Sequence, residues 1–585
     1  MTLTEQLLTL ENASLIRLAA AQPELAYLFR HALVHDATYS SLVRADRQRL
    51  HAMVGECLER MAGGAEATAE TAAALARHFD QAGDRRALRY ALAAAEAAAG
   101  RYANMEAVAH YDTVLRWAQR EASTSGAQLA AWHMARGRAL ELSGQYQAAQ
   151  ETYRALRRLG TERGDNGLTL KSLVLEGTLR ATVNPLFNIA EAERLVAEGL
   201  ALAQEVGDRA AEARIYWNKL NMLRFSGRFA EARRSGEASL RLAREAGDSE
   251  QLALTLNDLA HVYGMLGAWP EHRTASGEAA QRWRALGNLP MLADSLATTG
   301  LYASFRGDGG VARQAAREAM DIARSIGNLW GQAYSLSGIT YLMLFRADYE
   351  EGLRASYECL RLAEEAGYIV PAIINRTVLA DMLTDLGRPE EALEETRKAM
   401  KFAEERVSAM RGIAQGSLAI QLTANGLLDE AAVVADEANL ELMGEVVWAA
   451  EPIRRARAEV ALARGAPEAV RLAEERLAPM RRQELPPYIA DALLTLARAQ
   501  MQTGQPEAAR ASLAEARALS EQLGARRTLW RVLLGLARTT DDANEAAKHE
   551  AAGRAVVAMI ADELPERAWR EGFWRQAQAW ERGLA

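Results

Sequence analysis

A fixed period of forty residues is the feature that most constrains the fold of this chain. One series of glycines repeats at that spacing: Gly207, Gly247, Gly287, Gly327 and Gly367. A second series lies twenty residues out of phase with the first: Gly227, Gly267, Gly307, Ala347 and Gly387. A period of this length indicates a chain built from stacked copies of one structural unit.

Each period predicts two helices. After Gly207, apolar residues recur at helical spacing, as at Ile215, Tyr216, Leu220 and Leu223. Glycine favours the left-handed conformation that ends a helix, so both glycine series mark helix ends. Because one helical hairpin cannot bury its own apolar face, neighbouring hairpins must cover it. The pattern therefore predicts an all-α solenoid.

Two columns of residues show how the helices of this solenoid pack. Thirteen residues after each glycine of the first series stand Leu220, Ala260, Gly300, Thr340 and Ala380, four of them small. Nine residues after it stand Tyr216, Leu256, Leu296 and Leu336, which supply bulk. These columns resemble the tetratricopeptide repeat (TPR), although that repeat ordinarily has a period of about 34 residues. The longer form resembles repeats in the sensor regions of large bacterial signal-transduction ATPases, and it implies a right-handed superhelical solenoid of TPR-like hairpins.

Composition argues against several classes of protein. The chain has 585 residues, 25% of them charged, and a net charge of −8, which disfavours nucleic acid as a direct partner. Two cysteines, Cys57 and Cys359, are too few for a disulfide framework. The sequence shows no signal peptide and no apolar run of about 18 residues, so we expect a cytoplasmic protein that does not enter membranes. No catalytic or metal-ligand spacing is recognisable, so we expect neither enzyme activity nor a cofactor.

Residues 1–62 differ from the repeats. The leucine-rich run from Leu7 to Leu18 predicts one or two short helices, and residues 25–30 predict a short strand. The order Phe29-Arg30-His31-Ala32-Leu33-Val34-His35-Asp36, followed by residues 47–51, resembles the end of a winged-helix domain in the STAND class of signal-transduction ATPases. Residues 75–92 resemble the helical linker of the group that contains the maltose-operon activator and the cyclase-associated ATPases. The resemblance implies a partial winged-helix segment at the N-terminus.

A nucleotide role follows from this resemblance only in part. In the STAND class a winged-helix histidine contacts bound ADP, and His31 is the matching residue, which implies a cofactor contact only if an NTPase domain is present. The chain has no G-x-x-x-x-G-K-[ST] motif, since none of its five lysines follows a glycine. Without that lysine and its loop there is no phosphate site of this kind.

The predicted organisation has four parts: a partial winged-helix segment (1–62), a helical linker with the first hairpins (63–125), a TPR-like solenoid (126–540) and C-terminal capping helices (541–585). In the resembled repeat, the first helix of each hairpin lines the concave face. The matching positions here mix aromatic, amide and charged residues: Arg214, Trp217, Asn221, Phe225, Asn257, His261, Asp294, Phe305, Tyr334, Tyr341, Phe345 and Asp381. Such mixtures are typical of recognition surfaces. We therefore expect Leu296 to serve the packing and Tyr341 to serve a ligand.

The function favoured by these observations is non-enzymatic binding. The concave face would hold a protein or peptide, or a small effector, and the chain would be the sensor arm of a STAND-type signalling regulator. Two alternatives stay open. The chain could be a fragment of a nucleotide-dependent ATPase regulator whose P-loop domain is missing or separately encoded. It could also be a free-standing assembly adaptor.

Overall fold

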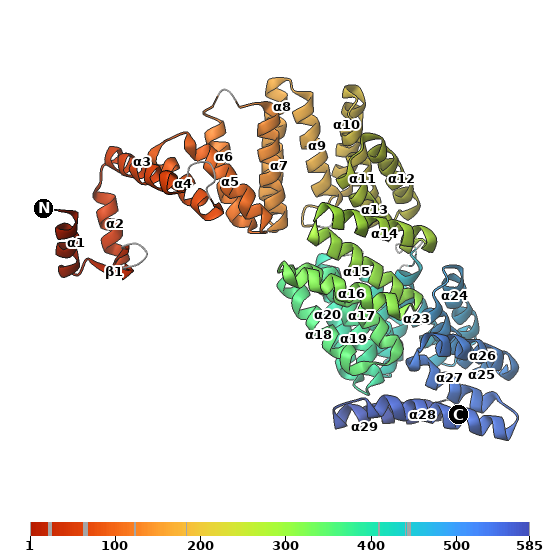
Figure 1. Cartoon of the computed structure of the whole chain (residues 1–585). Helices are drawn as coiled ribbons and strands as arrows, with labels where there is room; N and C mark the ends of the chain where they lie inside the picture. Colours follow the sequence, from red (N-terminus) through yellow and green to blue (C-terminus); the bar gives the residue numbers. More distant parts are fainter. Residues whose placement is uncertain are drawn as a thin grey trace. The chain divides into compact units, whose positions relative to one another are not determined.

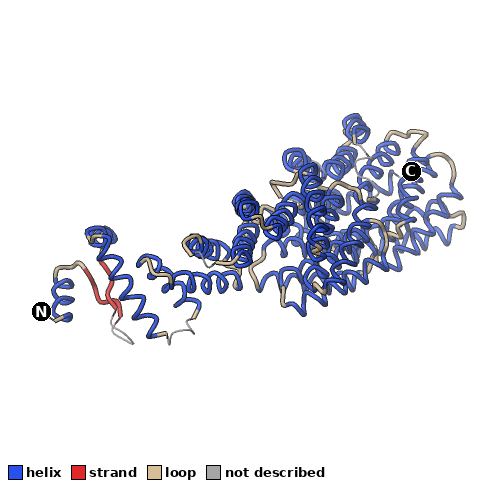
Figure 2. Tube along the Cα trace, turned by 90° about the horizontal axis from the view of Figure 1, so that it is seen from above, coloured by secondary structure: helices blue, strands red, loops and turns tan. Residues whose placement is uncertain are grey.

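The structure analysed is a computed structural model of the whole chain. It describes residues 2–20, 26–62, 68–121, 124–182, 184–407, 410–438, 440 and 446–583. Within these residues the chain forms 29 α-helices and two short strands, which confirms the all-α superhelical solenoid (Figures 1 and 2). The chain divides into two compact units, Met1–Leu179 with Asn184–Leu186 and Arg180–Val183 with Phe187–Ala585. This division falls within the predicted solenoid, and the boundaries at 62, 125 and 540 stay predictions.

The first unit begins with a small mixed segment. Its elements are α1 (Leu3–Asn12), β1 (Ile16–Ala20), β2 (Ala26–Phe29), α2 (Ala32–Ser41) and α3 (Arg44–Met61). The strands pair antiparallel, with Ile16 opposite Phe29 and Leu18 opposite Tyr27, and they are the two red stretches of the tube near the N-terminus in Figure 2. The strand predicted at 25–30 is confirmed for residues 26–29. The prediction of helix as far as Leu18 is wrong, because Ser14, with φ of 60°, ends the helical path and a strand follows.

Antiparallel helices make up the rest of the first unit. They are α4 (Ala69–Ala82), α5 (Arg86–Gly100), α6 (Asn104–Ala118), α7 (Gly126–Leu142), α8 (Tyr146–Arg163) and α9 (Asn166–Ala181). Phe79 is fully buried in their core and stacks on Tyr90, with ring centroids 5.7 Å apart. The Arg86 guanidinium lies over the Phe79 ring and pairs with Glu59 at 2.8 Å. These contacts join α3 to α4 and α5, so the N-terminal segment continues into the stack of hairpins.

The second unit contains the regular repeats and the C-terminal helices. Its helices are α10 (Ile189–Val206), α11 (Arg209–Phe225), α12 (Phe229–Ala246), α13 (Ser249–Met265), α14 (Trp269–Leu286), α15 (Leu289–Arg306), α16 (Gly309–Ser325), α17 (Leu329–Arg346), α18 (Tyr349–Glu365), α19 (Ile369–Asp385), α20 (Pro389–Arg406), α21 (Arg411–Ala424), α22 (Leu428–Glu437), α23 (Val447–Ala463), α24 (Ala469–Arg482), α25 (Pro486–Gln502), α26 (Pro506–Leu523), α27 (Arg526–Thr539), α28 (Ala543–Asp562) and α29 (Arg567–Gly583). Helices joined by a short turn pack against each other throughout.

The two glycine series lie where the sequence placed them, at the ends of helices. Every glycine of both series has a left-handed backbone, with φ between 64° and 79°. Ala347 stands at the equivalent position of the second series and has a φ of 57°. A left-handed backbone costs a residue that has a side chain roughly 1–2 kcal/mol. The Ala347 side chain is buried in the core around α17 and α18. Burial of that methyl group offsets part of the conformational cost.

The last hairpins of the second unit return to the first ones. Helix α15 contacts α25, α17 contacts α27, and α19 contacts α29, so partners lie ten helices apart in each case. The turns between paired helices form the seam (Figure 1, green beside blue). There the Trp269 indole donates to the carbonyl of Gln483 at 2.7 Å, and Arg526 donates to the carbonyl of Arg346 at 2.8 Å. One superhelical turn therefore stacks on the next.

Candidate binding site on the inner face of the repeats

The first helix of each hairpin in the second unit forms an inner layer. Direct contacts run from α11 to α13, α15, α17, α19, α21, α23, α25 and α27 in succession. The predicted concave-face residues all lie on helices of this layer, from α11 to α19. Their contacts divide them into two groups, one that packs among the earlier helices of this layer and one that contacts the later helices α23 and α25.

Asparagine and aspartate side chains join neighbouring helices in the first group. Asn221 of α11 donates from Nδ2 to Oδ2 of Asp258 at 2.9 Å, and Asn257 of α13 donates to Oδ2 of Asp294 at 2.7 Å. Ser295 in turn donates to Oδ1 of Asn257. Both asparagines are buried, whereas the two carboxylates are partly exposed. The amides therefore fix the carboxylates in position on the inner face.

A hydroxyl and ring network lies next to these carboxylates. The Thr298 hydroxyl is 3.0 Å from Nε2 of His261 and 3.1 Å from the Tyr334 hydroxyl. His261 also stacks on the Tyr334 ring and meets the edge of the Tyr302 ring. Burial is the main cause that lowers the pKa of His261, and the charge of Arg224 adds to it. His261 is therefore a neutral hydrogen-bonding group at pH 7.

Arginine and indole groups border the same region. Arg224 pairs with Asp258 at 3.3 Å, and Arg214 lies over the Trp217 ring at 4.2 Å from its centroid. The buried Nε of Arg224 and Nε1 of Trp217 have no hydrogen-bond acceptor among the residues that the structure describes. Phe225 meets the Phe187 ring edge to face at 6.2 Å. Buried donors without acceptors are uncommon in proteins.

Asp294 differs from the other inner carboxylates. Across the described part of the chain, no nitrogen of lysine, arginine or histidine lies within ion-pair distance of it, whereas Asp258 has Arg224 and Asp381 has Arg455 at 2.6 Å. Burial raises the pKa of Asp294 to about 6, and the hydrogen bond from Asn257 opposes this only in part. A carboxylate of this kind is poorly stabilised in its charged form.

Later helices of the same unit contact the second group of predicted residues. The Phe305 ring lies 5.0 Å from Tyr341 and 5.4 Å from Trp448, and the Phe345 ring lies 5.2 Å from Tyr488. Trp448 and Tyr488 belong to α23 and α25, which return along the seam. Tyr341 and Phe345 therefore have packing partners that the repeat pattern does not reveal.

A buried ionic layer fills the inner space beside this group. Asp381 pairs with Arg455, and Asp385 pairs with Arg527 at 2.5 Å and Arg531 at 2.7 Å. Burial raises the pKa of Asp385, but the two arginines outweigh it and hold the pKa below its ordinary value. Because each charge has a partner, this layer supports the stacking of one turn on the next.

Two further aromatic residues, Trp330 and Tyr368, lie beside the first group and were not predicted from the sequence. The Trp330 ring lies 5.4 Å from Tyr334 and 5.0 Å from Tyr368. They stand three residues and one residue after the nearest glycine of the first series, beside the turn between hairpins. Those positions lie outside the columns taken to line the concave face. The only available signal was their aromatic character.

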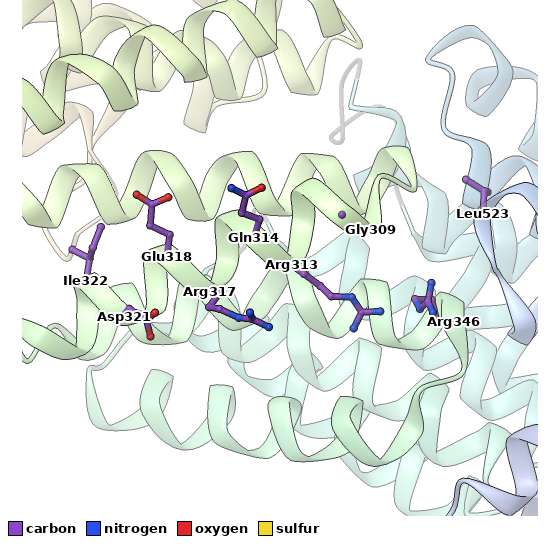
Figure 3. A pocket seen from close by; sticks show the side chains of 10 residues that line it. Gly309, Arg313, Gln314, Arg317, Glu318, Asp321, Ile322, Arg346 and Leu523 are labelled. Atoms are coloured by element: carbon purple, nitrogen blue, oxygen red, sulfur yellow. The ribbon is translucent and has the colours of Figure 1, made fainter.

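The remaining candidates lie elsewhere. His31 is exposed at the N-cap of α2 and makes no side-chain capping bond, so its nucleotide role stays a prediction. A surface depression of about 740 Å³ lies along α16, with Asp321 at one end and Leu523 at the other (Figure 3). Its wall carries both signs of charge, since Arg313 lies 3.7 Å from Asp348 and Glu318 pairs with Arg284. The depression therefore does not favour one class of ligand.

The described residues contain no group of three or more histidine, cysteine, aspartate or glutamate side chains arranged to hold a metal ion. None of the helices in the described ranges is long and apolar enough to cross a bilayer.

Comparisons with known proteins give fold-level similarity. No protein-family profile matches the sequence, and no curated protein matches it either. The structure is similar to the Rap protein complexed with competence and sporulation factor, at 15% identity and a TM-score of 0.43, over 68% of this chain and 98% of that one. It is similar to the APC/C hetero-tetramer Cut9-Hcn1, at 14% identity and a TM-score of 0.47, over 91% and 98%. It is also similar to yeast Tom70, at 13% identity and a TM-score of 0.31, over 78% and 96%.

Proposed function

We propose that the second unit is a non-enzymatic scaffold that binds a segment of another protein, or a peptide, on the inner face of α11, α13, α15 and α17. The observation that carries this proposal is the pair of carboxylates that Asn221 and Asn257 hold in place beside aromatic rings. Groups fixed before a ligand arrives lose little freedom on binding, which favours affinity and specificity.

The chemistry of this face suits a peptide. The carboxylates of Asp258 and Asp294 are partly exposed acceptors, and the main chain of a peptide offers N–H donors at regular spacing. The Trp330 ring, which is half-buried beside Tyr334, offers apolar surface for side chains. A small effector with the same groups would use the same contacts, so it stays the second occupant to test.

A display library of random peptides tests this proposal. Binders selected on the intact chain should lose affinity for a Trp217→Ala variant. They should keep affinity for Arg317→Ala, which removes a side chain from the outer face of α16 (Figure 3). Selected peptides that bind both variants as well as the wild type would place recognition elsewhere and refute the proposal.

We propose further that the whole chain is the sensor arm of a STAND-type regulator. The support is the resemblance of residues 15–120 to the winged helix and linker of that class, together with the strand pair β1–β2 in front of α2. The DNA next to the coding sequence supplies a test, because the proposal requires a P-loop NTPase encoded in frame or in a neighbouring gene. A genome without either would favour the free-standing adaptor.

A further inference from the structure

Asp294 is a carboxylate that the protein holds in place without neutralising it. Asn257 fixes one oxygen at 2.7 Å, and within the described ranges no basic nitrogen lies within 4 Å of either oxygen. The neighbouring inner carboxylates differ in this respect, because Asp258 and Asp381 each form an ion pair with an arginine. A partly buried charge without a partner costs stability, so its presence on the face proposed to bind a ligand requires an explanation.

Aromatic rings stand beside this carboxylate. Asp294 and Thr298 are one helical turn apart on α15 and therefore lie on the same face. The Thr298 hydroxyl bonds to the Tyr334 hydroxyl at 3.1 Å, and the Trp330 ring bridges Tyr334 and Tyr368. Burial chiefly raises the pKa of both tyrosines, and the charge of Asp294 raises it further, so both rings lie within the field of the carboxylate.

We propose that Asp294, with the rings of Trp330, Tyr334 and Tyr368, is a subsite for a cationic group, namely a lysine or arginine side chain or the amino terminus of the bound segment. This subsite deepens the proposed function and depends on it. A cation supplies the charge that Asp294 lacks. The faces of tryptophan and tyrosine rings attract cations as well, most strongly where water is excluded. The same site would reject an acidic side chain at this position.

The charged groups around the subsite fit this assignment. Arg224 on α11 is paired with Asp258 on α13, and His261 on α13 is neutral because burial lowers its pKa. Tyr334 on α17 and Tyr368 before α19 are neutral as well, since their pKa values are raised. Among the residues that the structure describes, Asp294 is thus the carboxylate of this region without an ion-pair partner, and a cation bound there would meet no positive charge other than the paired Arg224.

The binding of a cation should depend on pH in one direction. The free carboxyl has a pKa of about 6, so part of it is protonated at pH 6. A bound cation favours the ionised form, so affinity should rise from pH 5 to pH 7 and then level off. Binding at pH 6 should release protons, which calorimetry in buffers of different ionisation enthalpy detects.

Two small probes test the subsite without a known partner. N-acetyl-arginine methylamide carries the cation, and N-acetyl-citrulline methylamide is its neutral isostere. In titrations followed by NMR, we expect the arginine probe to bind about tenfold more tightly than the citrulline probe. Asp294→Asn should remove that difference, while Asp321→Asn, an exposed carboxylate on α16, should preserve it. Circular dichroism should show both variants as folded as the wild type. Equal binding of the two probes to the wild type would overturn the proposal.

Library selection separates this proposal from the proposed function. Peptides selected on the wild type should be enriched in lysine or arginine, and the enrichment should disappear on Asp294→Asn. Peptides that require Trp217 but show no enrichment would overturn the subsite and leave the binding face standing. If no peptide requires Trp217, the proposed function fails, and the arginine and citrulline probes alone decide whether Asp294 binds a cation.

Discussion

The seam between superhelical turns gives the sharpest prediction, and Gly572 is its test. Gly572 lies within α29, where it faces the turn between α19 and α20. A Cβ atom at this position would stand 2.0 Å from the carbonyl oxygen of Leu386 and 3.0 Å from its carbonyl carbon. The obstacle is backbone rather than the end of a flexible side chain. Helix α29 must therefore move if Gly572 is replaced by alanine.

The expected cost follows from two opposing terms. Alanine is the better helix former by about 1 kcal/mol, which stabilises α29 itself. Overpacking a closed contact costs typically about 1–3 kcal/mol, and full release of α29 would also expose Phe573, which packs on Trp530 and Tyr349. Loss of a buried phenylalanine costs about 3–5 kcal/mol. Gly572→Ala should therefore destabilise the docking of α29 by up to about 4 kcal/mol.

Amide hydrogen exchange measures this cost where it arises, because a solenoid does not unfold as one unit. Exchange of the α29 amides should accelerate in Gly572→Ala while exchange in α13 and α15 is unchanged. Gly583→Ala is the matched control, since it lies in the same helix with no atom within 4 Å of the added Cβ. If the α29 amides of Gly572→Ala exchange as slowly as those of this control, the close packing of Gly572 against the Leu386 carbonyl is refuted.

Four further predictions concern the core, the seam, the inner carboxylates and nucleotide binding. Leu256→Ala should lower the free energy of unfolding by about 2–5 kcal/mol in urea denaturation, because Leu256 is buried in the core of the repeats. Tyr341→Ala should cost roughly 3 kcal/mol in the same assay, since its ring packs on Phe305; a negligible cost would return Tyr341 to the ligand-binding group. The free energy of unfolding should rise by about 1 kcal/mol as pH falls from 7 to 5, because the raised pKa of Asp294 favours its protonated form in the folded protein, and Asp294→Asn should remove that rise. Below pH 4 the lowered pKa of Asp385 acts in the opposite direction, so acid should destabilise the seam. Calorimetry should detect no ATP binding, since the chain has no P-loop motif, and micromolar binding that EDTA reverses would contradict this.

Much of the fold could be predicted because its signals are local. A glycine such as Gly207 satisfies a backbone requirement of its own turn, and forty-residue spacing repeats that requirement. Leu256 and Leu296 were assigned to the core for a similar reason, and both are buried. The strand at residues 16–20 was missed because a five-residue alternation after a leucine-rich helix carries little weight in the sequence.

The binding face could be predicted only in part, because its limits depend on contacts distant in sequence. The repeat frame assigns Phe305 and His261 to the same inner layer, and the structure agrees on that. The repeat frame does not reveal that Trp448 and Tyr488, more than a hundred residues later in the sequence, pack on Phe305. No periodic pattern marks those two residues as partners of the earlier repeats.

The contrast between the two groups of inner residues locates the site. Both are built on the same repeat, and both place aspartates on the inner face. Beside α19, arginines from α23 and α27 neutralise Asp381 and Asp385, so the inner layer there is satisfied by the chain itself. Beside α15, no returning helix within the described residues brings an arginine into ion-pair distance of Asp294, and burial keeps the pKa of that carboxyl raised. The repeat alone therefore does not determine where this face can bind a ligand. The position depends on which inner aspartates are neutralised by arginines from the returning hairpins.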